Sequence, residues 1–348
     1  MPPAVGYVGL DHPHRDAYLD LLADRDATVT CACEPDDSFD AGDVDLDVPL
    51  YRDPGDLLAA EAVDAVWVTL PNRDTPAVVA DALAAGVDVF AEKPMARTAD
   101  DLEPVAEAAA DSAATLAVAY ANRAHPAARA LRERLRAGVL GELRAVEARL
   151  VATTLDGRLA GPGRYTYRAD ASRGGILQWL GCHWLDLIEW ATGDPIERVA
   201  AGTFAADATD VEAGMVLQWE AASGALGSLS CGYHLDARKD TTLRIYGEEG
   251  RATTSLIAGE HYTGETRLTV ERHGGGPAPR REIVYDHEPA SGYLGRVGGA
   301  FVDAFFAACR GERETPAGLG AARRTLAVMD AAYEAAATDE WVAVASQS

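Results

Sequence analysis

Lysine is almost missing from this chain of 348 residues. Only Lys93 and Lys239 are lysines among 31 basic residues, and 55 acidic residues give a formal net charge of −24 and a pI near 4.6. Such a surface repels polyanions, which excludes nucleic acid and anionic membrane surfaces as partners. Disorder also produces acidic chains, but a hydrophobic content of 48% argues against it. We interpret the acidity as a solvated surface suited to high salt, where screening weakens self-repulsion, and predict a halophilic protein.

Cysteine is scarce, and long apolar runs are absent. The five cysteines are an odd number without a C-x-x-C pair, so we predict neither a disulfide framework nor a metal site. Cys31 and Cys33 stand two apart on a predicted strand and should point to the same side as small buried residues. No run is long enough to span a bilayer, and Met1-Pro2-Pro3 leads straight into a strand, which predicts a cytoplasmic protein without a targeting segment.

The segment Val63–Ala96 has the pattern of a strand, a helix and a second strand. Ala65–Leu70 is a short β-branched run typical of a strand buried on both faces, as in a parallel sheet. Thr75–Ala85 has helical spacing, and Gly86 follows as a helix end before the strand Val87–Phe90. Together they predict a right-handed βαβ unit.

Polar residues follow both strands of this unit. Ligands of open α/β sheets bind beyond the carboxyl ends of the strands, so Pro71-Asn72 and Glu92-Lys93-Pro94 should face one crevice. A partly buried lysine can act as an acid or a base, whereas arginine cannot release its proton. One of the only two lysines in the chain stands at this position, which predicts a chemical role for Lys93. The alternative is a lysine that only pairs with Glu92 or caps a strand end.

The first strand, Ala4–Leu10, runs into a loop that only partly fits a dinucleotide-binding fingerprint. Of the three glycines expected in Gly9–His14, only Gly9 is present. Asp11 places a negative charge near the expected phosphates, which is unfavourable unless it is turned away as a helix cap. His12 can partly offset this charge by donating a hydrogen bond. The loop alone is weak evidence for NAD, although its place before the helix starting at Ala17 is right.

Glu34 ends the second predicted strand, Thr28–Cys33, and lies 25 residues after Gly9. An acidic residue at about this distance commonly binds the adenosine ribose hydroxyls and repels a 2′-phosphate. No arginine follows immediately, so Glu34 favours NAD over NADP. The alternative is a solvated turn in an acid-rich protein.

These motifs together resemble the Gfo/Idh/MocA oxidoreductases, named for glucose–fructose oxidoreductase and inositol dehydrogenase. The resemblance rests on TLPN, a helix ending in AAGVDVF, and AEKPMA, in that order. It implies that Lys93 contacts nicotinamide and substrate and helps to move the proton of the substrate hydroxyl. It also implies that Pro71, Asn72 and Glu92 line the nicotinamide end of the cofactor. Asn122, in an Asn-Arg pair, resembles the family's element at the crossover between domains, and we include it in the cofactor site.

The chain divides into two predicted domains. Residues 1–121 should form a Rossmann domain with a doubly wound parallel sheet of about six strands. Residues 122–348 should form a substrate and oligomerisation domain, in which a large open, mostly antiparallel sheet is flanked by helices. Its predicted strands are Leu143–Thr153, Val199–Phe204, Val211–Trp219, Gly227–Tyr233, Thr242–Tyr246, Arg251–Ser255, Thr266–Glu271 and Arg281–Tyr285. The resemblance implies a homodimer or homotetramer formed through the outer face of this sheet.

A buried helix beginning at Gly174-Gly175 should carry the second half of the site. The family motif there is D-x-G-x-H-x-x-D. Aligned on Gly181, it places His183 at the histidine and Asp186 at the last aspartate, whereas Trp179 replaces the first aspartate. An indole N–H is only a donor, so Lys93 and His183 would have to share the proton transfer. The spacing of four puts Trp179 and His183 on one helix face. The alternatives are a hydrogen-bonded interdomain histidine and a structural Asp186.

Further substrate contacts are predicted from aromatic and basic side chains in loops and at strand ends. They are Arg158, Tyr165, Tyr167, Arg168, Tyr233 and His234, in addition to Trp179 and His183. Such residues suit a polyhydroxylated or acidic ligand, although similar loops are often only solvated. The sequence thus predicts an NAD-dependent dehydrogenase of a sugar, cyclitol or sugar acid. The alternatives are a relative that retains NAD for lyase, epimerase or glycosidase chemistry, and a non-catalytic sensor of nucleotide or sugar.

Overall fold

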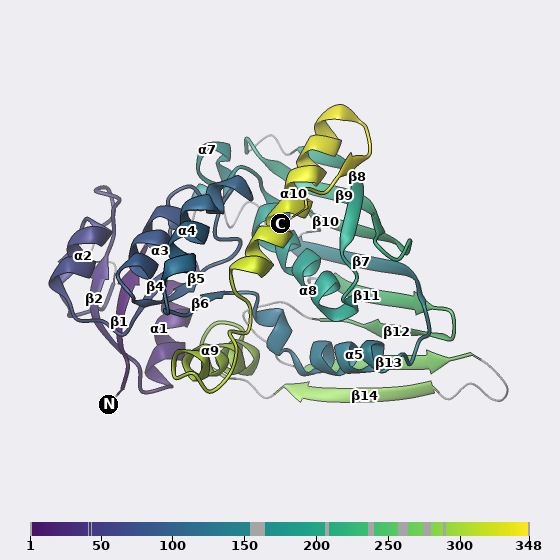
Figure 1. The fold of residues 1–348 in the computed structure, drawn as a ribbon, viewed down its shortest axis with the longest axis horizontal. Helices are drawn as coiled ribbons and strands as arrows, with labels where there is room; N and C mark the ends of the chain where they lie inside the picture. Colours follow the sequence, from purple (N-terminus) through teal and green to yellow (C-terminus); the bar gives the residue numbers. More distant parts are fainter. Residues whose placement is uncertain are drawn as a thin grey trace.

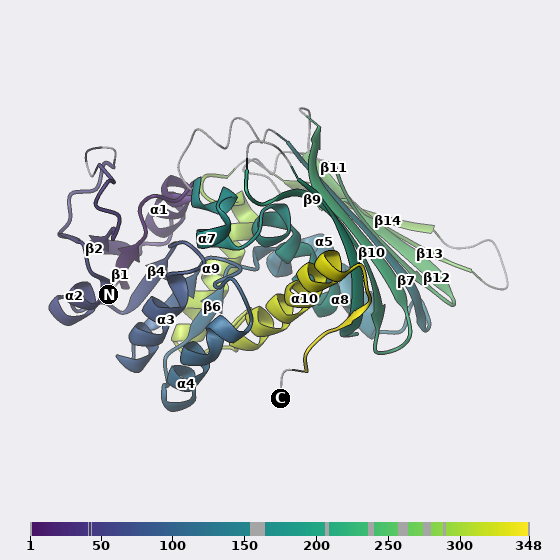
Figure 2. The same ribbon diagram turned by 90° about the horizontal axis from the view of Figure 1, so that it is seen from above.

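A computed structural model describes residues 2–40, 42, 44–153, 164–205, 209–235, 240–256, 264–273, 280–287 and 290–346. It contains two β-sheets that lie side by side, with helices between and around them (Figures 1 and 2). The predicted fold class is confirmed, because one sheet is parallel and doubly wound and the other is large, open and mostly antiparallel.

The first sheet has six parallel strands in the order β3-β2-β1-β4-β5-β6. The strands are β1 (Ala4–Val8), β2 (Thr28–Cys33), β3 (Leu50–Tyr51), β4 (Ala65–Val68), β5 (Asp88–Ala91) and β6 (Leu116–Val118). The helices are α1 (Arg15–Ala23), α2 (Pro54–Ala60), α3 (Thr75–Ala84), a 3₁₀ turn η2 (Asp100–Leu102) and α4 (Glu103–Asp111). The edge strand β3 has two residues and no alternation, so sequence periodicity could not locate it.

The second sheet has nine strands in the order β14-β13-β12-β11-β7-β10-β9-β8-β15, antiparallel except for the pair β7 and β10. The strands are β7 (Leu143–Thr153), β8 (Ile196–Ala205), β9 (Glu212–Ala221), β10 (Leu226–Leu235), β11 (Asp240–Gly247), β12 (Gly250–Thr254), β13 (Gly264–Arg272), β14 (Arg280–His287) and β15 (Val342–Ala343). All eight predicted strands are found. Polar and apolar residues alternate along these strands because one face of the sheet packs on helices.

The helices that cover this inner face are α5 (Pro126–Arg136), α8 (Cys182–Thr192) and α10 (Leu319–Thr338), and they lie toward the first sheet (Figure 2). Short elements connect the two halves: η3 (Ala121–Ala124), η4 (Arg164–Tyr167), α7 (Ala169–Ser172) and the π-helical η5 (Leu177–Gly181). Within the described residues, no helix has the length and apolarity needed to cross a membrane. All five cysteines are free, and Cys31 and Cys33 are buried as predicted.

The helix α9 (Gly295–Cys309) returns from the end of the chain to pack on the first sheet. Trp67 of β4 and Phe90 of β5 stack with ring centroids 3.7 Å apart. Phe301 and Phe305 of α9 meet Phe90 edge-to-face at 6.1 and 5.5 Å. A segment from beyond the second sheet thus completes the core of the first. The domain boundary near residue 121 stays a prediction.

Phe305→Ala should lower the free energy of unfolding by about 3–5 kcal/mol, because it leaves a cavity against Trp67 and Phe90. Phe305→Leu keeps most of the side-chain volume and should cost less than half as much. Urea titrations at one salt concentration, followed by circular dichroism, measure both changes. Equal midpoints for wild type and Phe305→Ala would show that α9 does not stabilise the first sheet.

Candidate active site

Lys93 is a buried cation just beyond the end of β5, and its side chain is fully enclosed. Its Nζ donates a hydrogen bond to the carbonyl oxygen of Trp179 at 2.9 Å and lies 3.7 Å from the centroid of the indole ring. The Glu92 carboxylate is 3.5 Å away. A carbonyl, a π face and a carboxylate together compensate the loss of water around the ammonium.

Glu92 is the negative centre of the cluster. Its Oε1 accepts hydrogen bonds from the Tyr18 hydroxyl at 2.6 Å and from His14 Nδ1 at 3.2 Å. Burial alone would raise the pKa of Glu92, but the Lys93 ammonium and His14 outweigh it and hold the pKa well below its usual value. Glu92 is therefore a carboxylate at neutral pH, and Lys93 has a permanent counter-ion.

Aromatic rings enclose the cation and its counter-ion. His14 stacks on Trp179 with centroids 5.2 Å apart and contacts Tyr293 at 4.3 Å. His12 lies 5.7 Å from Trp179, and burial holds its pKa well below the usual value, so its ring is neutral. An indole ring thus contacts the cation and both histidines.

Three of these residues could in principle hold a cation. Possible ligand atoms of His12, His14 and Glu92 all lie within 4.8 Å of one another. Glu92 already has three partners, however, and the Lys93 ammonium 3.5 Å away opposes a second positive charge. The expectation that the site needs no metal stays a prediction.

A bulge in β9 fixes the start of the helix that carries Trp179 and His183. The register with β8 shifts between Phe204 and Ala205, and such a shift re-aims the side chains of the bulged strand. Glu212 accepts hydrogen bonds from the backbone N–H groups of Gly175 at 2.7 Å and Leu177 at 3.0 Å. A Cβ on Gly175 would lie 2.0 Å from the Glu212 carbonyl oxygen, so only glycine fits this approach.

The predicted helix therefore begins just after Gly175, but its first turn is the π-helical η5, which contains Trp179. The prediction that a spacing of four puts Trp179 and His183 on one face assumes an α-helix, and this turn is not α-helical. Trp179 contacts Lys93, His12 and His14, whereas the His183 ring lies 6.3 Å from that of Tyr120. Their presence in one substrate pocket stays a prediction.

His183 is a neutral, buried histidine. Burial, followed by the nearby Lys93 charge, lowers the pKa of His183 to about 3. Among the described residues, no group forms a hydrogen bond with its Nδ1. A pKa this low makes the neutral ring a weak base at pH 7, so the role of His183 as a base stays a prediction. Asp186 instead forms an ion pair with Arg123, with Arg123 Nε donating at 2.9 Å, which is a structural contact.

A cavity of about 860 Å³ opens beyond the carboxyl ends of β1, β2 and β4. Gly9 borders it with a φ of +97°, and a Cβ there would lie 2.7 Å from the Thr69 carbonyl carbon. The other lining residues are Asp11, Glu34, Pro35, Asp36, Ser38, Thr69, Leu70, Pro71, Arg73, Asp74, Tyr165, Tyr167, Arg168 and Ala171. Tyr165 also lies 6.2 Å from His12, which connects the cavity to the lysine cluster.

Glu34 is turned inward rather than solvated. Its Oε2 accepts the backbone N–H groups of Leu10 at 2.6 Å and Asp11 at 2.9 Å, and its Oε1 accepts that of Asp36 at 3.0 Å. The solvated-turn alternative is therefore wrong. In this arrangement the carboxylate holds the loop amides that face the pyrophosphate in dinucleotide-binding folds. Among the described residues, its Oε1 accepts only the hydrogen bond from Asp36, and the contact of Glu34 with ribose stays a prediction.

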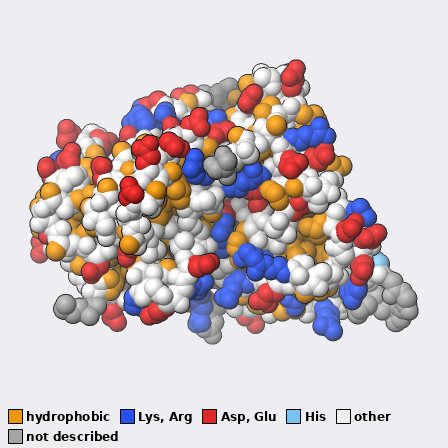
Figure 3. All heavy atoms as spheres, in the orientation of Figure 1, with side chains coloured by type: hydrophobic (Ala, Val, Ile, Leu, Met, Phe, Trp, Pro, Cys, Tyr) orange, Lys and Arg blue, Asp and Glu red, His pale blue; other side chains and the backbone are white. Residues whose placement is uncertain are grey.

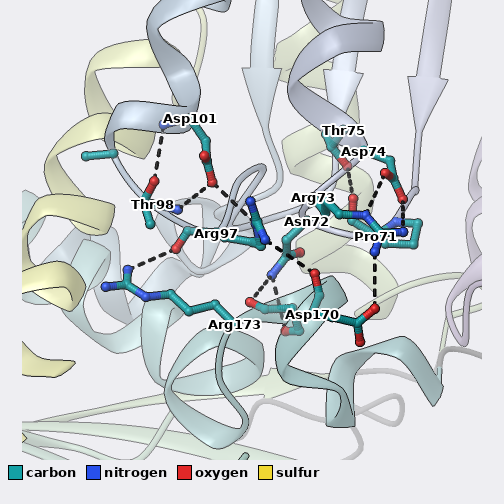
Figure 4. Close-up of polar contacts among 12 residues, drawn as sticks. Pro71, Asn72, Arg73, Asp74, Thr75, Arg97, Thr98, Asp101, Asp170 and Arg173 are labelled. Atoms are coloured by element: carbon teal, nitrogen blue, oxygen red, sulfur yellow. Dashed lines mark hydrogen bonds and ion pairs between the residues drawn. The ribbon is translucent and has the colours of Figure 1, made fainter. Parts of the chain in front are cut away.

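Asn72 joins the two halves of the chain, and its side-chain amide donates to the Ser172 carbonyl and hydroxyl oxygens at 3.3 Å each. Around it, Arg73 bonds Asp170 at 3.2 Å and Arg97 donates to the Asp170 carbonyl oxygen at 3.4 Å (Figure 4). The structure thus places Asn72 at the junction of the halves and Pro71 at the cavity.

The remaining candidates fall in different places. Arg168 lines the cavity and pairs with Asp170 at 2.8 Å, and the Tyr233 hydroxyl lies 3.3 Å from that of Tyr167. His234 is exposed and lies against Gly214 and Gly232, outside the cavity. Asn122 is buried, and within the described residues its Oδ1 has no hydrogen-bond partner. Arg158 lies outside the described residues.

Sequence reasoning missed Tyr18 and Tyr293. Tyr18 lies on α1 and Tyr293 just before α9, far apart in the chain, yet their rings are 4.7 Å apart beside Glu92 and His14. No spacing rule connects these positions. Arg73 was also missed at the cavity, although its place directly after Pro71-Asn72 could have indicated it.

The parallel sheet, the cavity at its strand ends and the enclosed lysine define an oxidoreductase of the two-sheet, nicotinamide-dependent class. Residues 5–120 match the model of the oxidoreductase family with an NAD-binding Rossmann fold, and residues 128–253 match the model of the GFO/IDH/MocA C-terminal domain. The chain belongs to the Gfo/Idh/MocA oxidoreductase family, and NAD is its cofactor class.

Individual relatives support this assignment. The chain is 29% identical to the rhizopine catabolism protein MocA of Rhizobium meliloti, over 59% of this chain and 63% of that protein. It is 30% identical to D-glucoside 3-dehydrogenase of Escherichia coli K12, over 64% of this chain and 68% of that protein. These matches span about two thirds of the relatives' lengths. The WlbA dehydrogenase of Bordetella pertussis, solved with NADH and UDP-GlcNAcA, has the same fold, with a TM-score of 0.81 at 20% identity over both full lengths.

The residues present fit a dinucleotide at this place. Dinucleotides bind beyond the carboxyl ends of parallel strands, next to a closely packed glycine loop. The cavity lies at this place, beside Gly9 and its close approach to the residues after β4. Within the described residues, His12 Nε2 and His183 Nδ1 are buried without a hydrogen-bond partner. Such atoms are costly unless a ligand engages them, so the cluster around Lys93 suits a bound polar ring.

His183→Gln should flatten the pH dependence of stability. The folded state keeps His183 neutral down to about pH 3, whereas the unfolded chain takes up a proton below 6.5. This histidine should therefore cost the wild type about 1.4 kcal/mol of unfolding free energy per pH unit as the pH falls below 6.5. Urea titrations between pH 7.5 and 5 measure the slope for wild type and variant.

His234→Gln is the matched control, because His234 is exposed. It should leave the slope of the wild type unchanged. If His183→Gln and His234→Gln give the same slope, His183 is not a neutral buried group.

Proposed function

We propose that this protein is an NAD-dependent dehydrogenase that oxidises a CH–OH group of a sugar, a cyclitol or a sugar acid. The observation that carries the proposal is the enclosed Lys93, held between Glu92 and Trp179 at the strand end next to the cavity. The relatives support the substrate class, since one is a D-glucoside 3-dehydrogenase.

Lys93 is placed to handle the proton of the substrate hydroxyl. Its hydrogen bond to the Trp179 carbonyl and its ion pair with Glu92 fix Nζ at one point, and the ammonium stabilises the negative charge that develops on the hydroxyl oxygen. Bound NAD supplies the acceptor for the hydride from the carbinol carbon. The hydroxyl proton passes to the neutral amine of Lys93, which first releases its own proton to solvent, and the low pKa of His183, about 3, makes its ring the weaker acceptor.

Trp179 cannot exchange a proton with Lys93. The family aspartate would accept a hydrogen bond and a proton, but the indole contributes only a π face and its backbone carbonyl. This arrangement supports Lys93, rather than the residue at position 179, as the group that exchanges a proton with substrate. The indole face beside the ammonium also suits stacking on a sugar ring.

Lys93→Ala should abolish turnover, by about 10²–10⁴-fold or more, while NADH binding survives. Lys93→Arg is the matched control, because it keeps a positive charge that cannot release a proton, and it should also lose turnover. NADH formation across a panel of sugars, cyclitols and sugar acids measures activity, and fluorescence titration measures cofactor binding. Full activity in either variant would refute the role of Lys93.

We further propose a homodimer or homotetramer formed through the outer face of the second sheet. Helices of the described part cover only the inner face (Figure 2). On β8, β9 and β10 the exposed residues include Phe204, Val216 and Leu226, with 60%, 51% and 57% of their surface accessible. Around β13 the exposed side chains are instead charged, as in the ion pair of Arg267 with Glu282 at 3.0 Å. The apolar end supports a protein contact.

Val216→Asp should therefore reduce the molar mass measured by light scattering to that of one chain, because it buries an unpaired charge in the contact. Val284→Asp is the control, since Val284 is also exposed but lies on β14, at the charged end. It should leave the assembly intact. A wild-type protein that is monomeric at all concentrations would refute the proposed contact.

The halophilic and cytoplasmic assignments also remain proposals. The net charge of −24 and the use of arginine in place of almost all lysine support the halophilic assignment, and the free cysteines support the cytoplasmic one. A surface of this kind is stabilised when salt screens its self-repulsion.

A further inference from the structure

A second cavity, of about 660 Å³, is lined by five arginines although the chain is strongly acidic. Its lining shares no residue with the cofactor cavity. The full lining is Arg123, Ala124, Arg129, Arg132, Glu133, Arg136, Trp190, Ala300, Phe301, Ala304, Arg313, Glu314, Thr315 and Pro316. Basic side chains gather at the hollow between the two halves of the molecule, over α5 (Figure 3).

The arginines come from one helix face and from the turn after α9. Arg129, Arg132 and Arg136 on α5 are spaced by three and four residues, which puts them on one side of the helix. Arg313 follows α9 and adds a fifth guanidinium to the lining. Phe301 and Ala304 of α9 contribute buried apolar side chains to the lining. The cavity thus combines a cationic wall with an apolar patch.

Most of this positive charge is uncompensated. Within the described part of the chain, only Arg123 of the five forms an ion pair, with Asp186. Glu133 and Glu314 also border the cavity, so its lining carries more positive than negative charge. Many arginines elsewhere in the described residues have a carboxylate partner, as Arg251 has Glu271 and Arg272 has Glu249, each at 2.6 Å. With 55 acidic residues in the chain, four unmatched arginines in one cavity need an explanation.

Arg132 shows the cost of this arrangement. Its guanidinium lies 4.2 Å from the Trp190 ring centroid, and its Nε is buried without a hydrogen-bond partner among the described residues. Burial, followed by the neighbouring Arg136 and Arg123, lowers the pKa of Arg132. Clustered guanidinium groups of this kind are stabilised when an anion lies between them.

We infer that this cavity binds a small molecule that carries two or more phosphate groups. Guanidinium groups bind phosphate oxygens through paired hydrogen bonds, and several arginines around one space suit more than one phosphate. The volume is in the range of ligand pockets, and Phe301 and Ala304 can contact a carbon skeleton. Non-specific attraction cannot produce such binding in a chain of net charge −24.

The site is connected to the active centre through one helix. Trp190 and His183 both lie on α8, two turns or about 10 Å apart. Arg123 follows Asn122 directly in the chain. It forms an ion pair with Asp186, which lies between His183 and Trp190 on α8. An anion at the arginines therefore binds next to the helix that positions His183.

Isothermal titration of the full-length protein with inorganic tripolyphosphate, at one fixed KCl concentration, tests the inference. The wild type should show one saturable site, and the double variant Arg132→Gln/Arg136→Gln should weaken it at least tenfold. Arg134→Gln is the matched control on the same helix, because Arg134 donates to the Ala130 carbonyl oxygen and does not line the cavity. It should change the affinity less than twofold.

Arg136→Gln alone guards against misfolding of the double variant, because Arg136 is exposed. It should weaken tripolyphosphate binding with an unchanged unfolding midpoint, and NADH affinity should stay constant. A hexose bisphosphate that binds more tightly than tripolyphosphate would support an organic phosphate ester as the ligand. Absence of saturable binding, equal losses in Arg134→Gln and the double variant, or tighter binding of citrate than of tripolyphosphate would overturn the inference.

Discussion

The burial of one ammonium group governs the arrangement of the active centre. The Lys93 side chain has no exposed surface, so Glu92, the Trp179 carbonyl and the Trp179 ring must all stand in fixed places around it. Glu92 is in turn held by Tyr18 from α1 and by His14 from the first loop. Trp179 depends on the bulge that lets Glu212 hold the start of its helix. One desolvated charge thus ties together both sheets and the first helix.

The sequence predicted the elements whose patterns are local. The buried runs of the first sheet and the alternating strands of the second, such as Leu143–Thr153, appear where the periodicity placed them, because each strand's faces see different environments. Lys93 and Glu92 were identified because they follow a buried strand. What the sequence could not predict depends on contacts between distant residues. Glu34 turns toward the loop amides, Tyr293 returns to His14, and a register shift redirects Glu212.

Arginine has two different uses in this chain. On the second sheet it forms ladders of ion pairs with acidic neighbours, where each pair contributes little alone but keeps an acidic surface ordered. On α5, Arg129, Arg132 and Arg136 have no carboxylate partner among the described residues and face a hollow between the halves. Composition predicts only the first use. The second becomes visible only when helix α5, Trp190 and the turn after α9 are seen around one space.

The position of α9 has a consequence for synthesis on the ribosome. The first sheet is complete in the chain at Val118, but the aromatic face of Trp67 and Phe90 is covered by Phe301 and Phe305. At about 5–20 residues per second, the roughly 180 residues between them take on the order of 10–40 s to be translated. During that interval the nascent sheet exposes two stacked aromatic rings, a surface that chaperones bind. The N-terminal half of this chain therefore cannot reach its native core co-translationally, and its folding is completed only after nearly the whole protein has been made.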